Sequence, residues 1–438
     1  MIWILCISYF LFTVIIAVLC LLLLRNKLPI SRIIALSIAL GLATFWLVHI
    51  FIPSIQLFFS SLNRIEYGYS VGVYVTSLVS SLSFILTAII TFTVLVVFNY
   101  QGRGREKLAT NLRGFQIDYV ASFLIIGACV PIVFFVFIEI LKVGLPLFLI
   151  NRISILKDFS AFTVVLNMLI FLGASLFFRY LQMRNLKSMI FFVLFSLSLF
   201  ILFSLIGSRN SIFIYIGVLL FAYLVCFRKI SIFKFSAVGA FSFLSLAVVG
   251  SIRTRLEDLN TGMLKESIHK SFESTISVFG NDEILRFLIT RRDDFSLQMG
   301  DTFMSGFLSI VPRFFWEGKP LGAGPLVTNL INPNSYIYGS EGISSYTTGI
   351  VAESYLNFGI FGGILCGFVW AVLMYLVGKY KTKSSLTFYL QVFVMFMLSA
   401  SIFYSEFLGF AIRIYIISIF TWSVLFVSKA VRRLSVSL

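Results

Sequence analysis

Long apolar runs fill most of this chain, and one polar stretch, residues 253–347, separates two groups of them. A helix that crosses a bilayer needs about 20 apolar residues. Of the 438 residues, 59% are hydrophobic and only 12% are charged, whereas a soluble domain has about 45–50% apolar residues. The chain therefore cannot fold as an ordinary soluble domain, and we expect a polytopic membrane protein.

The expected fold class is all-α, because the runs are too long and too uniformly apolar for the alternating strands of a β-barrel. A hydropathy window predicts about eleven transmembrane helices. They lie near residues 2–24, 33–52, 71–98, 119–141, 160–181, 189–206, 211–227, 236–252, 348–377, 386–404 and 410–428. The predicted domains are eight helices in residues 1–252, one large external loop at 253–347, and three helices in residues 348–438.

Clusters of Lys and Arg indicate the orientation, since short cytoplasmic loops collect them. Such clusters follow every odd-numbered span and close the chain. The C-terminus is therefore expected inside, with the N-terminus and the large loop outside. The net charge of +16 is then mostly a topology signal with attraction to anionic lipid, and we expect no nucleic-acid partner. All five cysteines fall within predicted spans, and the sequence predicts neither a metal site nor a cofactor.

Arg209 lies in a short polar segment, Gly207–Ser211, between the sixth and seventh predicted spans. A guanidinium held near the outer membrane surface can bind phosphate through two hydrogen bonds. The alternative is an arginine that extends to lipid headgroups. Arg253 and Arg255, which follow the eighth predicted span, are candidates for secondary phosphate contacts.

The segment Val311–Pro325 is the most specific part of the large loop. Its prolines and glycines fix an irregular backbone, and its aromatic residues, including Trp316, can anchor it at the interface. Arg313 and Lys319 would then be held in place, which suits binding of an anionic headgroup. A purely structural interface loop is the alternative.

Glu353 lies where hydrocarbon packing would favour an apolar residue, near the start of the ninth predicted span. Carboxylates inside spans are costly and are usually functional. Glu353 could accept a proton in catalysis, or it could be the buried partner of an arginine. Upstream, residues 263–279 have the spacing of an amphipathic helix that lies on the outer leaflet. Its His269 is expected to be a solvated surface residue.

These landmarks together resemble the Wzy family of O-antigen and oligosaccharide repeat-unit polymerases. The resemblance rests on the number of spans, the Gly-Ser-Arg turn at Arg209, the large late loop, the Pro-Arg-Phe-Phe-Trp stretch at 312–316, and the Thr-Gly…Ala-Glu-Ser-Tyr…Asn-Phe-Gly segment at 348–359. It implies a GT-C-like glycosyltransferase of lipopolysaccharide biosynthesis in the bacterial inner membrane, with a periplasmic loop and N-terminus and a cytoplasmic C-terminus. The related O-antigen ligases use a histidine in a late external loop, and the surroundings of His269 do not match that pattern.

The activity that the resemblance implies is transfer of a growing glycan from undecaprenyl pyrophosphate to an incoming lipid-linked repeat unit. Implied partners are these lipid-linked oligosaccharides, membrane lipid, a chain-length regulator of the Wzz type and a flippase of the Wzx type. Fixed cations can stabilise a departing diphosphate where other enzymes use a metal ion. Arg209 and Arg313 would bind the diphosphate, and Glu353 would activate the acceptor hydroxyl. The expected substrate contacts are Arg253, Arg255, Lys319, Trp316, Tyr336, Tyr338, Tyr346 and Tyr355.

Two other functions remain open from the sequence. A lipid-linked oligosaccharide flippase also handles a diphosphate lipid, but it should carry cations along the middle of its spans. A transferase that uses a polyprenyl-phosphate sugar typically has acidic residues in an early external loop. The early loop here, residues 53–70, offers only Glu66.

Overall fold

The computed structural model describes residues 2–24, 32–58, 65, 68–98, 116–145, 147–148, 155–156, 164–206, 209–226, 281–309, 311, 316, 318–336, 346–382 and 384–437. These residues form helices and connecting segments, and none of them forms a β-strand. The all-α expectation is therefore confirmed for the part of the chain that the structure describes.

Eight helical segments among the described residues are long and apolar enough to cross a membrane: Arg32–Phe58, Val71–Val97, Tyr119–Val143, Leu166–Met183, Leu186–Ile206, Gly349–Lys379, Ser385–Tyr404 and Phe407–Leu434. Two further helices, α1 (Ile2–Leu24) and α10 (Arg209–Cys226), contain shorter apolar stretches. The chain is thus a multi-pass membrane protein. The span predicted at 236–252 lies outside the described residues, so the total of eleven remains a prediction.

The chain divides into two compact units. The first comprises residues 1–105, 273–380 and 395–412, and the second comprises residues 106–272, 381–394 and 413–438. The described part of the polar insert belongs entirely to the first unit. Two long helices, α18 (Ser385–Phe396) and α20 (Phe407–Ser437), contribute residues to both units.

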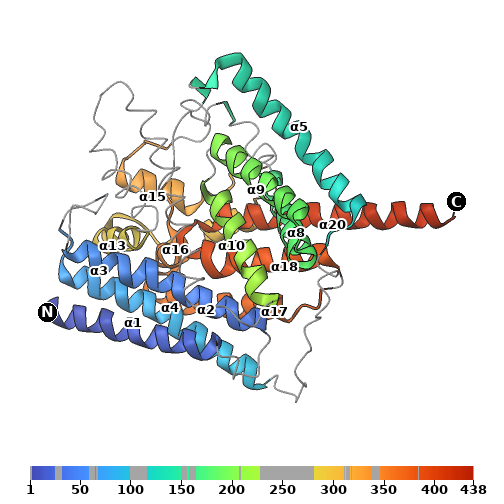
Figure 1. Ribbon diagram of the computed structural model, residues 1–438. Coiled ribbons are helices and arrows are strands. Elements are labelled where there is room, and N and C mark those ends of the chain that lie inside the picture. Colours follow the sequence, from blue (N-terminus) through green and yellow to red (C-terminus); the bar gives the residue numbers. More distant parts are fainter. Residues whose placement is uncertain are drawn as a thin grey trace. The chain divides into compact units, whose positions relative to one another are not determined.

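In the first unit, α1 lies along α2 (Arg32–Trp46), as Figure 1 shows in blue. The span that begins with α2 continues through a π-helical turn, η1 (Leu47–Phe51), into α3 (Ile52–Phe58). Pro53 has no amide hydrogen to pair with the preceding turn, so the wider turn lies where the regular α-helical pattern is interrupted. The turn includes His49, which is buried.

The most extensive helix pair in this unit is α4 (Val71–Phe98) against α17 (Gly362–Lys379). Gly363 and Gly367 lie four residues apart and face α4, where an added Cβ would collide with the backbone carbonyls of Ser80 and Phe84 respectively. Small residues at this spacing let two membrane helices approach closely. Because lipid tails are as apolar as the side chains, van der Waals packing holds such helices together. The glycine pair therefore explains why these two helices lie in contact.

The ninth predicted span is two helices in the structure. α16 (Gly349–Phe358) is followed by a short 3₁₀ turn, η8 (Gly359–Phe361), and then by α17. Gly359 has a φ of 61°, which a residue with a side chain rarely adopts. The expected single helix at 348–377 thus has a break near its start, and Glu353 lies on the first piece, in which residues 349–357 are buried.

The described part of the polar insert packs onto the apolar helices. Its first helix, α13 (Asp282–Thr290), contacts both α4 and α16, and residues 282–288 are all buried. After it come η6 (Arg292–Asp294), α14 (Asp301–Phe307) and α15 (Ala323–Ile331). Among the charges between α13 and α14, Arg291 and Asp294 form an exposed ion pair of 3.3 Å.

The last two spans of the chain are joined by a short turn. A second π-helical turn, η9 (Met397–Ser401), leads into α19 (Ile402–Tyr404), and α20 begins at Phe407. η9 packs against α2. Ser405 and Glu406 are the two residues between α19 and α20.

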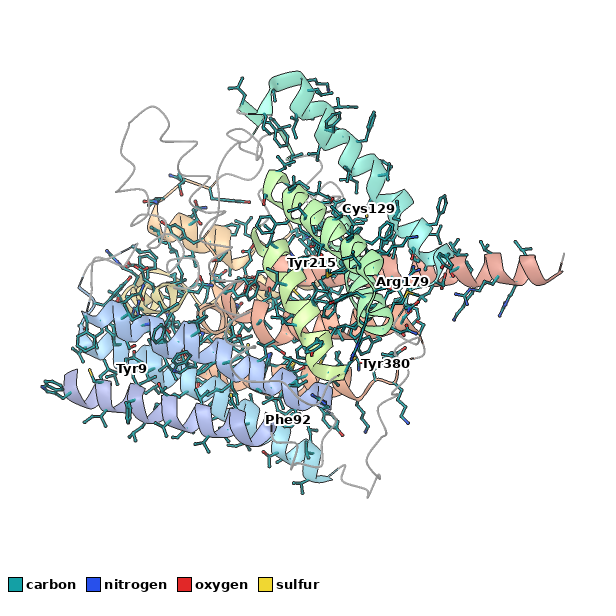
Figure 2. All side chains as sticks on the ribbon, viewed as in Figure 1. Tyr9, Phe92, Cys129, Arg179, Tyr215 and Tyr380 are labelled. Carbon is teal, nitrogen blue, oxygen red and sulfur yellow. The ribbon has the colours of Figure 1, made fainter. Side chains whose placement is uncertain are left out.

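The second unit contains α5 (Tyr119–Val143), η5 (Leu166–Met168), α8 (Leu169–Met183), α9 (Leu186–Ile206) and α10. Gly173 of α8 leaves room for the ring of Tyr215, whose hydroxyl lies 2.6 Å from Ser196 Oγ of α9 (Figure 2). Asp118 caps the N-terminus of α5 and forms an ion pair with Arg432 near the C-terminus. Asp118 and Arg432 therefore lie at the same end of this unit.

Candidate functional site

Glu353 is fully buried, and both of its carboxyl oxygens accept hydrogen bonds. Oε1 lies 2.8 Å from the hydroxyl of Thr302 on α14, and Oε2 lies 2.8 Å from the backbone nitrogen of Phe407. The partners are a hydroxyl and an amide rather than the arginine that the sequence suggested as an alternative. This carboxyl therefore joins three separate parts of the first unit: α16, the polar insert and the start of α20.

Asn357, one turn further along α16, strengthens the same connection. Its Nδ2 donates to Thr302 Oγ1 and to the carbonyl of Glu353, each at 2.7 Å, and its Oδ1 accepts from Gly300 N at 2.9 Å. Gly300 adopts a φ of 104° and precedes the first residue of α14. Thr302, Glu353 and Asn357 are each 0% exposed, so this polar network fixes the start of α14 to α16.

Lys319 closes part of the predicted binding loop. Its Nζ donates to the carbonyl of Val311 at 3.1 Å, and its backbone nitrogen donates to the carbonyl of Trp316 at 3.2 Å. The side-chain bond links Lys319 back to Val311, the backbone bond forms a local turn with Trp316, and the side chain of Lys319 is partly buried. Trp316 is 39% exposed. Residues 312–315 and 317 lie outside the described part of the structure, so a fixed backbone for the whole loop remains a prediction.

The helix α15 follows this loop, and two of the predicted tyrosines lie against it. Tyr336 N donates to Asn329 Oδ1 at 2.8 Å, and Tyr346 N donates to Thr328 Oγ1 at 3.0 Å. Both tyrosines are partly exposed, whereas Tyr355 of α16 is only 7% exposed. The structure thus places Tyr336 and Tyr346 against α15, which directly follows the loop that contains Lys319. Tyr355, in contrast, lies in the core.

The remaining predicted site residues are described only in part or not at all. Arg209 is the first residue of α10, so the predicted turn at 207–211 has already become helix at that point. Its side chain lies outside the described part of the structure, as do Arg253, Arg255, Arg313 and Tyr338. The predicted amphipathic helix with His269 also lies outside the described residues.

A second buried polar cluster was not predicted. Asp282 Oδ1 lies 3.0 Å from His49 Nδ1, while Asp282 Oδ2 accepts from Ser77 Oγ at 2.9 Å and from Arg286 at 3.1 Å. His49 is 2% exposed and the two charged residues are 0% exposed. Asp282 and Arg286 of α13 thus meet His49 of η1 and Ser77 of α4.

Arg286 has further partners within this cluster. Its Nη2 donates to Gln56 Oε1 at 2.5 Å, and its guanidinium carbon lies 4.5 Å and 5.4 Å from the ring centres of Tyr74 and Tyr69. A buried arginine is tolerated when its charge is paired and its donors are bonded. Next to Asp282, Glu283 Oε1 accepts from Ile65 N at 2.7 Å, which ties α13 to the segment that precedes α4.

The sequence carried a signal for this cluster. Asp282 and Arg286 are four residues apart, which places them on one face of a helix. His49 and Gln56 are polar residues in an apolar span, and such residues usually face a partner inside a membrane protein. The pairing itself was not predictable, because His49 and Asp282 are 233 positions apart.

A cavity lies beside this cluster, between α1 and the η1–α3 segment. Its walls carry the hydroxyl groups of Thr13 and Ser54. Thr13 donates to the carbonyl of Tyr9 and accepts from Trp46, and Ser54 donates to the carbonyl of Phe51. These hydroxyls serve the helices themselves, and the other walls are mostly apolar, so we assign no ligand to the cavity.

Among the described residues, no group of three or more His, Cys, Asp and Glu side chains is arranged to hold a metal ion. Comparisons of this chain with protein-family models, with curated proteins and with solved structures gave no match. The functional assignment therefore depends on the chemistry of the residues and on their arrangement.

Proposed function

We propose that this chain is a membrane glycosyltransferase of the Wzy type, which joins oligosaccharide repeat units carried on undecaprenyl pyrophosphate. The growing glycan would move to the terminal sugar of an incoming unit, and undecaprenyl pyrophosphate would be released. The observation that carries the proposal is the firm attachment of a polar insert to apolar helices. Its Lys319, Tyr336 and Tyr346 are partly exposed on an insert that packs against apolar helices, which suits a substrate that is part lipid and part sugar.

In this proposal the cations bind the diphosphate. Arg209 and Arg313 take the donor diphosphate, and Lys319, Arg253 and Arg255 assist them. Fixed cations stabilise the charge that develops on a departing diphosphate. Trp316, Tyr336, Tyr338 and Tyr346 offer aromatic faces and hydroxyl groups to the sugars.

Glu353 receives a positioning role in the proposal. A general base must come within hydrogen-bond reach of the hydroxyl whose proton it accepts. Glu353 is fully buried, and its oxygens already hold Thr302 and Phe407. It is better placed to fix the insert than to meet an acceptor sugar.

The test uses purified protein in lipid vesicles supplied with undecaprenyl-pyrophosphate-linked repeat units. A ladder of longer products with release of undecaprenyl pyrophosphate is expected, and it should form without added divalent metal. Only starting material in the presence of folded protein would refute the proposal. A requirement for added magnesium would refute the role given to the cations.

A flippase for the same lipid-linked units is the second candidate, and the buried Arg286 favours it. Transport of an anionic headgroup uses cations inside the helix bundle, and Arg286 of α13, which pairs with Asp282, is 0% exposed. Deletion of the gene separates the two functions. Loss of long surface glycan with retention of a single repeat unit supports the polymerase, whereas loss of all repeat units supports the flippase.

A further inference from the structure

The turn between α19 and α20 is surrounded by the polar insert. Asn281 Nδ2, next to α13, donates to the carbonyl of Tyr404 at 2.5 Å. Gly349, at the end of the insert, lies directly against the carbonyl of Phe403 and has a φ of 66°. A Cβ at Gly322 would lie 2.9 Å from Leu408. Residues at this turn therefore lie against Gly322, which belongs to the predicted binding loop.

Glu406 is the charged residue of this turn. Its Oε2 accepts a hydrogen bond of 2.9 Å from the backbone nitrogen of Gly324, in the first turn of α15. The positive end of a helix dipole stabilises a carboxylate at that place. Gly324 lies five positions after Lys319, so Glu406 adjoins the loop that carries the predicted diphosphate and sugar contacts.

Glu353 and Glu406 differ in their solvent exposure. Glu353 holds the backbone nitrogen of Phe407, the residue directly after Glu406, and the two carboxyl groups are close enough to interact electrostatically. Glu353 is 0% exposed, whereas Glu406 is partly exposed. Two neighbouring carboxyl groups in unlike surroundings can take different roles.

We propose that Glu406 is the catalytic base of the transfer, with Glu353 fixing the turn that carries it. This inference rests on the proposed glycosyltransferase function. The acceptor hydroxyl gives its proton to the Glu406 carboxylate while its oxygen forms a bond to the anomeric carbon of the donor sugar. The bond from that carbon to the diphosphate oxygen breaks, and the electron pair leaves with undecaprenyl pyrophosphate.

The Glu406→Gln variant separates this role from a structural one. The amide oxygen of glutamine can still accept the bond from Gly324 N, but the side chain cannot take up a proton. In the vesicle assay we expect kcat to fall about 100-fold or more, with KM and the thermal unfolding temperature close to those of the original protein. Glu406→Asp keeps the carboxylate and should retain part of the turnover.

Glu353→Gln tests the positioning role. It should lower the unfolding temperature, because a buried acceptor becomes a donor, and it should lower the kcat of the folded protein by less than Glu406→Gln does. Should Glu406→Gln fold poorly, Glu406→Ala with added formate replaces it, since a small carboxylate can occupy the vacated space. Formate that restores turnover supports the base role, and folded Glu406→Ala that formate does not rescue overturns it.

The outcomes distinguish failure of the proposed glycosyltransferase function from failure of the Glu406 assignment. Original protein that joins no units refutes the proposed function. Original protein that polymerises while Glu406→Gln polymerises equally fast overturns only the assignment of Glu406. Loss of kcat in Glu353→Gln but not in Glu406→Gln would exchange the two roles and also overturn it.

Discussion

His49 and Asp282 form a buried pair, with Nδ1 of the histidine 3.0 Å from Oδ1 of the aspartate. The histidine comes from a π-helical turn in an apolar span, and the aspartate is the first residue of α13 in the polar insert. With Arg286 and Ser77 as further partners of Asp282, the pair docks the insert onto the apolar helices. The insert is thus held by charges that lie deep in the first unit.

Removal of one charge from this cluster should destabilise the protein strongly. We expect Arg286→Met to lower the free energy of unfolding by about 3–5 kcal/mol, because Asp282 is then left buried without its charged partner. The double variant Arg286→Met with Asp282→Leu should recover part of this loss. Thermal unfolding in detergent measures both, and Arg291→Ala, which breaks only an exposed pair, serves as control. A double variant less stable than Arg286→Met alone would contradict the prediction.

Truncation of Glu353 should release the insert from α16 and α20. Glu353→Ala leaves the Thr302 hydroxyl and the Phe407 amide without their acceptor and also creates a cavity. We expect a loss of about 2–5 kcal/mol, with a smaller loss for Glu353→Gln, which keeps one acceptor oxygen. Limited proteolysis of residues 290–325 should become faster in the alanine variant. Equal protease resistance of the two variants and the original protein would show that this carboxyl does not hold the insert.

The contact between α4 and α17 should tolerate no side chain at its glycines. Gly367→Ala would place a methyl group against the backbone of Phe84, and overpacking of this kind costs about 1–3 kcal/mol. Gly127→Ala in α5 is the matched control, because a Cβ there meets nothing within 4 Å. The unfolding temperature should fall for the first variant and stay unchanged or rise slightly for the second. A pair of equally stable variants would argue against close packing at Gly367.

Replacement of Arg209 or Arg313 by Ala should abolish glycan ladders while the protein remains in the membrane. Replacement by Lys should restore only part of the polymer, because an ammonium group cannot make the paired bonds of a guanidinium. Gel analysis of surface glycan, together with a blot of the membrane fraction, measures both. Arg292→Ala, which removes an arginine bonded to its own loop, is the control. Normal ladders from both alanine variants would refute the diphosphate-binding role.

Apolar run length predicted where the described spans lie, although the second span extends to Phe58 rather than 52 and the last to Leu434 rather than 428. For example, α1 and α4 occupy the predicted ranges, since the length of a span depends on the bilayer thickness. The break between α16 and α17 was not predicted. It depends on Gly359 adopting a positive φ, and an apolar run that contains a glycine does not reveal this.

The candidate site was predicted only in part. A Pro- and Gly-rich segment with cations predicted a fixed loop. The structure describes the bond from Lys319 to Val311, and the rest of this prediction falls on residues outside the described ones. Glu353 was recognised as unusual, but its burial and its bond to Phe407 depend on how the two ends of the first unit pack. Glu406 was not predicted as a site residue, because a single carboxylate beside a span is ordinarily a surface residue. Only the structure shows that it lies next to α15.

The sequence by itself determined that this chain is a helical membrane protein with one large polar insert, because hydrocarbon excludes unpaired backbone polar groups from any lipid-exposed segment. Only the tertiary structure decided which polar residues are partners. Asp282 reaches His49, and Glu406 reaches Gly324, across long separations in the chain. Local periodicity carries no information on such distant pairs, since they form only when several helices pack and each buried charge must find a partner.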